Sequence, residues 1–291
     1  LQVVLGLDVA RIASAFLSSP QALGQRLVRA KQKIRDAGIP FEIPERDALP
    51  TRLQDVLDGI YVAYGTGWDD IDGMDAKHAD LTLEALQLGT AMVALMPEAA
   101  EPRGLLALML FCDARNRARR TFSGDYVPLS EQNVDQWDHE KIARADALLI
   151  GAATLRQLGP YQLEAAIQSA HCQRRLGKPV ASRDLLLLYD QLVDLRPSIG
   201  ARVSRASVLA AVHGVQSGLE ALTKIPAPQI ATYQPYWAVR AHLLALDNQA
   251  SAAEASYDRA IALASSASIK EYLWRRRTKL ALKNQAPVSQ S

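Results

Sequence analysis

The sequence predicts an all-α protein, and three observations support this. Hydrophobic residues make up 49% of the 291 residues, with many Ala and Leu, whereas only 6% are aromatic. This composition favours helices over strands. Apolar residues recur at helical spacing along most of the chain. The 16 glycines and 14 prolines fall largely between these periodic stretches, where they would end helices.

Two helices joined by a tight turn are predicted within residues 1–39. Asp8 is suited to cap the first helix, whose apolar stripe would be Val9, Ile12, Ala13 and Phe16. Ser19 would cap the second helix and Pro20 would occupy its first position. The second helix is expected to end near Asp36, before Gly38 and Pro40. Its inner face would consist of Leu23, Leu27, Ala30 and Ile34.

The charge is concentrated in the same segment. Residues 1–40 contain six basic and two acidic residues, a net charge of +4, so the rest of the chain sums to −2. Two helices of which the second is amphipathic and basic fit a helix-turn-helix that places its second helix in the major groove of DNA. An ordinary helical hairpin with a solvated basic face fits the same pattern, and the pattern alone leaves both interpretations open.

These helices resemble region 4 of the extracytoplasmic-function σ factors, in which a stretch of the form L-x-x-x-E-I-A … T-V-x-S-R-L-x-R-A-R-x-x-L reads the −35 promoter element. The matching stretches are Leu7-Asp8-Val9-x-x-Ile12-Ala13 and Leu23-x-x-Arg26-Leu27-x-Arg29-Ala30-x-x-x-Ile34-Arg35. The chain departs from the family at Arg11, where Glu is usual, and at Ala22-Leu23, where Thr-Val is usual.

The resemblance implies a set of DNA-binding residues: Gln21, Gln25, Val28, Arg29, Lys31, Lys33 and Arg35. Gln25 would pair with adenine, and Arg29 would bond guanine or a phosphate. The last three would make sequence-independent phosphate contacts. Gly24 also matches an outward-facing position but has no side chain to offer.

Helix follows helix from residue 49 onward. The predicted spans are 50–64, 76–95, 101–115, 136–157, 160–175, 182–194, 199–212, 215–224, 234–246, 250–264 and 268–283. Residues 41–44 would form an extended strap between two prolines. We therefore expect a helix-turn-helix over 1–39, a helical extension over 40–158 with an irregular loop or hairpin near 116–135, helical repeats over 159–285, and a disordered tail over 286–291.

A repeat of the tetratricopeptide (TPR) type is visible in the C-terminal half. The residues at its positions 4, 8, 11, 20, 24 and 27 are Trp237, Ala241, Leu244, Ala253, Tyr257 and Ala260. Two periods earlier, Leu185, Tyr189, Leu192 and Pro197 fit the same register. In the repeat between them Thr223 falls where a large apolar residue belongs, so its second helix should be short or shifted by one residue. A non-repetitive helical bundle is the alternative.

The segment 113–138 interrupts the helices. A small hairpin is expected around Ser123-Gly124-Asp125. One interpretation of Arg115, Arg117, Arg119 and Arg120 is an anion or partner site. The interpretation we favour is that these arginines pair with Glu131, Asp135 and Asp138 and pin the loop to the bundle. Stretches at Leu105–Arg115, Gln132–Asp138 and Gly159–Ile167 are similar to the extension of the σ-factor subgroup that carries a TPR domain.

No catalytic, metal or cofactor motif is found. The acidic stretch Asp69–Asp75 lacks EF-hand spacing, and the five histidines and two cysteines (Cys112 and Cys172) show no metal-binding spacing. His139 suits a capping role at a helix start. Arg275, Arg276 and Arg277, with Lys279 and Lys283, suit a solvated helix end, with a second nucleic-acid contact as the alternative.

The resemblance implies a σ factor for transcription initiation, not an enzyme, with promoter DNA and core RNA polymerase as partners. The extension would bind σ region 2, which this chain lacks, or a regulatory protein. The alternative is a TPR-like interaction scaffold that does not bind DNA. Because the chain starts at Leu1 within a helix, we expect the natural protein to continue before it. No apolar run reaches the roughly 18–20 residues of a membrane span, so no membrane contact is expected, and the cysteine usage favours the cytoplasm.

Overall fold

The protein is built of α-helices, as the sequence predicts. The computed structural model describes residues 9–15, 18–38, 48–68, 76–177 and 181–285. Its α-helices are α1 (Val9–Ala15), α2 (Pro20–Asp36), α3 (Leu49–Trp68), α4 (Ala76–Leu95), α5 (Ala100–Asp113), α6 (His139–Thr154), α7 (Pro160–Cys172), α8 (Ser182–Leu195), α9 (Ile199–His213), α10 (Val215–Thr223), α11 (Ala227–Ile230), α12 (Gln234–Leu246), α13 (Ala250–Leu263) and α14 (Ala267–Gln285). Short 3₁₀ turns are η2 (Asn116–Arg119), η3 (Leu129–Glu131), η4 (Val134–Gln136) and η5 (Gln173–Leu176). Several expectations fall outside the described residues: the Asp8 cap, Phe16 of the first apolar stripe, Pro40, the strap at 41–44, the acidic stretch at 69–75 and the tail at 286–291.

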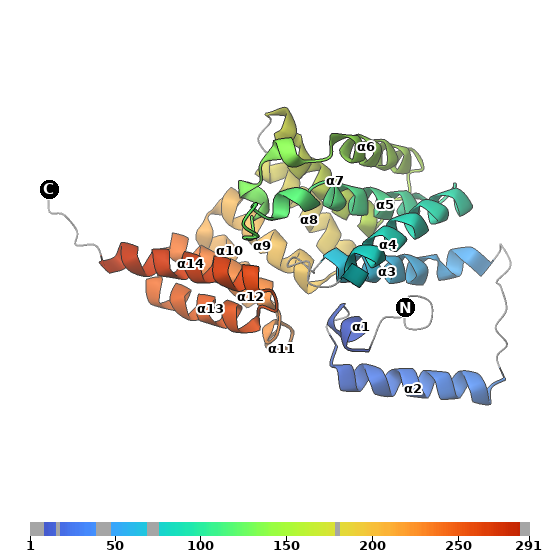
Figure 1. Ribbon diagram of the computed structural model, residues 1–291, viewed down its shortest axis with the longest axis horizontal. Coiled ribbons are helices and arrows are strands. Elements are labelled where there is room, and N and C mark those ends of the chain that lie inside the picture. Colours follow the sequence, from blue (N-terminus) through green and yellow to red (C-terminus); the bar gives the residue numbers. More distant parts are fainter. Residues whose placement is uncertain (1–8, 16–17, 39–47, 69–75, 178–180, 286–291) are drawn as a thin grey trace.

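The central core surrounds α5. Residues Leu105–Phe111 of this helix are buried on every side, because α3, α4, α6 and α7 all pack against it. A helix that is apolar around its whole circumference is stable only in such a fully enclosed position. The segment Leu-Leu-Ala-Leu-Met-Leu-Phe is therefore explained by its place in the fold, at the middle of the helical layers in Figure 1.

Helix α7 packs on both α5 and α8, and from α8 onward each helix packs mainly on its neighbours in the sequence. The pairs α7–α8, α8–α9, α9–α10, α12–α13 and α13–α14 are all in contact, and α12 also packs on α9 and α10. Three separate apolar clusters lie along this series. Sequential stacking with small, local cores is the organisation of a helical solenoid, and the series extends away from the central core to α14 (Figure 1).

The weak repeat is both short and shifted. Helix α10 has nine residues, and it buries Leu222 while Thr223 is exposed. Gly218, also buried, lies so close to α9 that a Cβ there would come within 2.6 Å of the Ala210 side chain. The one-residue shift therefore brings an apolar side chain and a glycine to the packed face.

Several helix boundaries differ from the prediction. Helices α6 and α7 each end three residues earlier than expected, at Thr154 and Cys172. The end of α3 and the start of α6 differ as well. Helix α3 continues through Gly65 and Gly67 to Trp68, and the Thr66 hydroxyl donates to the Val62 carbonyl oxygen within it. The expected break at these glycines is thus wrong. Helix α6 begins three residues later than expected, because the Asp138 side chain accepts a hydrogen bond from the Lys141 amide (3.0 Å) and caps the helix. The cap is Asp138 itself, and the neighbouring His139 is exposed.

The expected hairpin in the irregular segment is present in minimal form. Arg120 and Tyr126 form an isolated antiparallel bridge, and Gly124 adopts a positive φ of 89° in the turn between them. The Thr121 amide donates to the Asp125 carbonyl oxygen (2.9 Å), and the Gly124 amide donates to that of Thr121 (3.0 Å). Glycine is favoured at this turn because side-chain-bearing residues rarely adopt that φ.

Candidate nucleic-acid interface

Helix α2 starts as the sequence predicts. The Ser19 hydroxyl accepts a hydrogen bond from the Ala22 amide (3.1 Å), and Pro20 follows at the first helical position. Leu23 packs into a small cluster with Ile12, Val62 and Leu81, which come from α1, α3 and α4. This cluster attaches the two N-terminal helices to the extension. In Figure 1 they lie at one edge of the molecule, next to α3.

The inner face of α2 is covered only in its first half. Leu23 and Leu27 are partly buried, but Ala30 is exposed and Ile34 is 51% exposed, so the predicted inner face is wrong at these two positions. The described part of α1 has seven residues and α2 has 17, or about 10 Å against about 26 Å of helix. The second half of α2 extends past the helix that packs on it.

All seven residues assigned to DNA contact are exposed on α2: Gln21, Gln25, Val28, Arg29, Lys31, Lys33 and Arg35. Val28 is 69% exposed, a large value for an aliphatic side chain on a helix. The Arg29 Nε atom donates to the Gln25 carbonyl oxygen (3.3 Å), so this guanidinium lies along the helix surface. Gly24 is the exception to the outward-facing set, because a Cβ there would lie 3.8 Å from Val9 of α1.

The four arginines of the irregular segment do not form one site. Arg115 is buried, with its Nε donating to the Phe111 carbonyl oxygen (3.1 Å) and its Nη2 to the side chain of Gln168. Arg119 is also buried: its Nη1 donates to the Trp68 carbonyl oxygen (2.6 Å), and its guanidinium lies 3.7 Å from the centroid of the Trp68 ring. Both arginines hold the segment to the bundle, as expected, but by carbonyl and ring contacts.

One of the three predicted acidic partners, Asp138, is engaged by another residue. Asp138 caps α6 and lies 3.6 Å from the Lys141 ammonium, which also pairs with Asp113 at 2.7 Å. The expected pairing of the arginines with Asp138 is therefore wrong. Arg117 and Arg120 are exposed and line a cavity of about 650 Å³ with Trp137.

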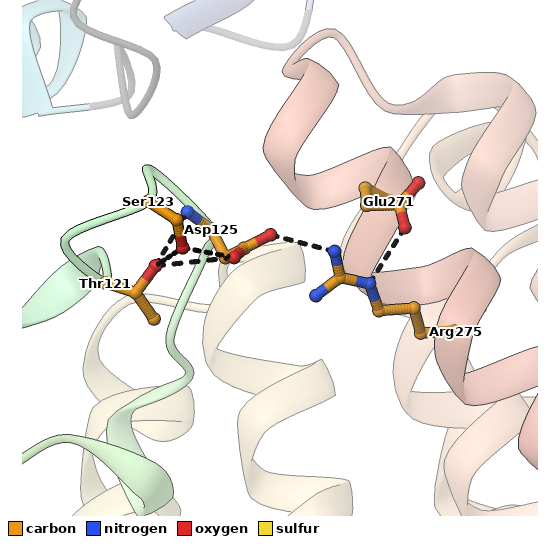
Figure 2. A network of polar contacts seen from close by, with 5 residues as sticks. All are labelled: Thr121, Ser123, Asp125, Glu271 and Arg275. Atoms are coloured by element: carbon orange, nitrogen blue, oxygen red, sulfur yellow. Dashed lines mark hydrogen bonds and ion pairs between the residues drawn. The ribbon is translucent and has the colours of Figure 1, made fainter.

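The arginines of α14 are paired. Arg275 binds Asp125 (2.9 Å) and Glu271 (2.8 Å), and Arg277 binds Asp258 (2.7 Å). The expectation of a merely solvated helix end is thus wrong for Arg275, which reaches the irregular segment 150 residues away (Figure 2). The Lys283 side chain lies outside the described residues.

Sequence reasoning missed a polar network that joins α3, α5, α7 and α8. Its centre is the Gly159–Pro160–Tyr161–Gln162 stretch, where Glu101 accepts hydrogen bonds from the amides of Tyr161 (3.0 Å) and Gln162 (3.1 Å). The Tyr161 hydroxyl donates to Asp58 (2.6 Å), which also pairs with Arg196 (2.9 Å). The sequence did contain a signal for this network. Gly159-Pro160 predicts a helix start, and the apolar residues that follow Tyr161 and Gln162 indicate that this start is buried.

A second tyrosine–carboxylate contact belongs to this network. The Tyr61 hydroxyl donates to a carboxylate oxygen of Glu164 (3.0 Å), and the Tyr61 ring packs edge-to-face on that of Tyr161 (5.4 Å between centroids). Burial raises the pKa of the Glu164 carboxyl and the pKa values of both tyrosines. The arrangement joins the central core to the first helices of the solenoid.

The chain is similar to a protein family and to a relative for which no activity is described. Residues 52–153, which span α3 to α6, match a family of unknown function (DUF6596). The chain is 35% identical over 273 residues, or 94% of its length, to an uncharacterized protein of Rhizobium meliloti (strain 1021). It spans 64% of the length of that relative. No solved structure shows significant similarity to the chain.

Two further properties bear on the kind of site. Within the described residues, no group of three or more His, Cys, Asp or Glu side chains is placed to hold a metal ion. None of the described helices combines the length and apolar character that crossing a membrane requires.

Proposed function

We propose that this chain is the DNA-reading and protein-binding part of a σ-factor-like transcription initiation protein. The observation that carries the proposal is the exposure of α2, which has no buried residue although it is anchored to the extension through Leu23. A helix held at one end and open along its outer side has the geometry needed to enter a major groove.

Charge supports the same role. Helix α2 contains five basic residues and one acidic residue, a net charge of +4 over 17 residues. Its length of about 26 Å would bring the basic residues of its second half near the phosphates on either side of a groove. In this proposal Lys31, Lys33 and Arg35 contact phosphates, while Gln25 and Arg29 read base edges. Arg29 would leave its bond to the Gln25 carbonyl oxygen to do so.

The extension would contribute protein contacts and no chemistry. In the proposal its partners are core RNA polymerase and σ region 2 or a regulatory protein, and the chain is neither an enzyme nor a cofactor carrier. Transcription in bacteria takes place in the cytoplasm, which we propose as the location. The two cysteines, Cys112 and Cys172, form no disulfide, which is consistent with a reducing compartment.

The alternative is a TPR-like scaffold in which the N-terminal helices only cap the solenoid. One observation favours it: Ile12 of α1 is buried against Val62 and Leu81 of the extension, as a capping helix would be. The exposure of α2 favours DNA binding instead, because a helix that served only as a cap would bury its own apolar residues. Ile34 at its far end is exposed.

The test is run-off transcription by core RNA polymerase with the natural protein. The test variant is Gln25→Ala/Arg29→Ala, and the matched control is Gln191→Ala/Arg144→Ala, which removes the same two side-chain types from exposed positions on α8 and α6. Loss of two base contacts should lower promoter-specific transcript at least tenfold, and the control should equal the wild type. Equal transcript from both variants, or no promoter-specific transcript from the folded wild type, would reject the proposal.

A further inference from the structure

A cleft lies between the irregular segment and α14, away from α2. It has a volume of about 540 Å³ and is lined by residues 118–136 on one side and by residues of α14 on the other. In Figure 1, α14 lies at the opposite side of the molecule from α2. The cleft is therefore a second surface that DNA contact by α2 leaves unused.

The lining of the cleft is cationic. Arg120 lines it from the irregular segment. Arg275 and Arg276 line it from one turn of α14, and Lys279 from the next turn. Asp125 and Glu131 are the acidic residues in the lining. Four positive and two negative side chains leave a net charge of +2 at one concave surface.

The wall between these charges is aromatic. Tyr126 and Tyr272 pack edge-to-face with ring centroids 5.4 Å apart, so the pair bridges the two sides of the cleft. Burial raises the pKa of both hydroxyls above the ordinary value of 10.0, at which a tyrosine is already neutral and able to donate hydrogen bonds at physiological pH. Aromatic and arginine side chains at one concave surface are the composition of protein-binding hot spots.

The cleft already accommodates one carboxylate of the chain itself. Asp125 reaches across to Arg275, and Figure 2 shows that its other oxygen accepts a hydrogen bond from Ser123 (2.7 Å). Thr121 holds the turn, since its hydroxyl accepts from the Asp125 amide (3.0 Å). The turn thus presents an aspartate to α14 in the way that a bound acidic peptide would.

We infer that this cleft is a binding site for an acidic peptide segment of a partner protein, whose carboxylates pair with Arg276, Lys279 and Arg120 and compete with Asp125 for Arg275. A single-stranded nucleic acid fits less well. Its bases would need open aromatic faces for stacking, and the two tyrosine rings are engaged with each other. The inference goes beyond the proposed contact of α2 with DNA and does not depend on it.

The test is a fluorescence anisotropy titration of the full chain with a short labelled peptide of alternating glutamate and alanine. Lys279→Glu reverses a charge that lines the cleft, and Lys270→Glu makes the same change at an exposed position of the same helix outside the cleft. We expect Lys279→Glu to weaken binding about tenfold and Lys270→Glu to change it less than about twofold. Equal weakening by the two variants would mean unspecific attraction and would overturn the inference.

A second pair of variants tests the competition. Asp125→Asn removes the internal carboxylate, and Glu220→Gln removes one negative charge from an exposed position of α10. We expect Asp125→Asn to strengthen peptide binding at least about threefold, whereas Glu220→Gln should leave it within about twofold. No gain from Asp125→Asn over its control would contradict the assigned site. A labelled oligothymidylate is tested in the same way. If it bound more tightly than the peptide and Lys279→Glu weakened its binding, the ligand of the cleft would be a nucleic acid and the inferred acidic peptide would be wrong. Either failure leaves the transcription result for α2 unaffected.

Discussion

The Tyr161 hydroxyl donates a hydrogen bond of 2.6 Å to a carboxylate oxygen of Asp58 and so ties α7 to α3. The other Asp58 oxygen pairs with Arg196, which follows α8 and whose guanidinium lies 5.3 Å from the centroid of the Tyr161 ring. A single carboxylate therefore connects the central core to the first turns of the solenoid. This contact acts together with the Tyr61–Glu164 hydrogen bond, which joins the same two parts of the extension.

Replacement of this tyrosine measures the contact. Tyr161→Phe leaves the ring in place and removes the hydroxyl, so Asp58 keeps Arg196 but loses its buried donor. We expect the free energy of unfolding to fall by about 1–2 kcal/mol in urea denaturation. Tyr126→Phe, a hydroxyl at the cleft, should change it by less than about 0.5 kcal/mol. An unchanged midpoint for Tyr161→Phe would show that the bond contributes nothing to stability.

The glycine before Pro160 is expected to be intolerant of a side chain. A Cβ at Gly159 would overlap the Glu101 carboxylate, which accepts the hydrogen bonds of the first α7 amides. Gly159→Ala should therefore lower the free energy of unfolding by about 2–3 kcal/mol, by displacing a charged cap. Gly65→Ala is the matched control, because nothing lies within 4 Å of a Cβ at this position of α3.

For Gly65→Ala the sign should be reversed. Alanine in a helix interior is favoured over glycine by about 0.5–1 kcal/mol, so this variant should melt at a higher temperature than the wild type. Thermal unfolding followed by circular dichroism measures both variants. If Gly159→Ala proved as stable as Gly65→Ala, the predicted clash with the Glu101 carboxylate would be contradicted.

Arginines 117 and 119 should differ sharply although they are two residues apart. Arg119→Met removes the hydrogen bond to the Trp68 carbonyl oxygen and the stacked cation, at a cost of about 1–3 kcal/mol. Arg117→Met changes an exposed side chain and should cost less than about 0.5 kcal/mol. Chemical denaturation of both variants compares them. Similar costs would mean that the contact with Trp68 does not anchor the segment.

Local signals in the sequence predicted helices well and long-range contacts poorly. The Ser19 cap and Pro20 were readable because each depends on neighbours within one turn. The shifted repeat at Thr223 was readable because the repeats on either side of it fix its register. The exposure of Ile34 was not, because it depends on the length of α1 and on what packs beyond it. Apolar periodicity says that a face can be buried, and only the tertiary arrangement decides whether a partner reaches it.

The arginine segment shows the same limit for charges. Acidic residues of the same segment, Glu131, Asp135 and Asp138, were the partners expected for the arginines. The fold instead brings Gln168 of α7 to Arg115 and Trp68 of α3 to Arg119. Asp125 and Arg275, which are 150 residues apart, meet for the same reason. The exposed residues of α2 were named correctly as a set, since a basic outer face is a property of the helix itself. Their contact with DNA stays a prediction.

The Glu164 carboxyl should make stability depend on pH. Burial raises its pKa above the ordinary value of 4.5, although the hydrogen bond from Tyr61 acts in the opposite direction. The folded chain therefore binds more protons at this site than the unfolded chain, and the contribution of Glu164 to stability falls as pH rises above 4.5 toward the raised pKa.

The variant Glu164→Gln tests this dependence, because its side chain keeps an acceptor for Tyr61 and cannot ionise. We expect the free energy of unfolding of Glu164→Gln to rise relative to that of the wild type as pH is raised through this window. Urea denaturation at a series of pH values measures this difference. A difference between the two proteins that stays constant with pH would mean that Glu164 ionises equally easily in the folded and unfolded chains, and that the network around Tyr61 does not desolvate it.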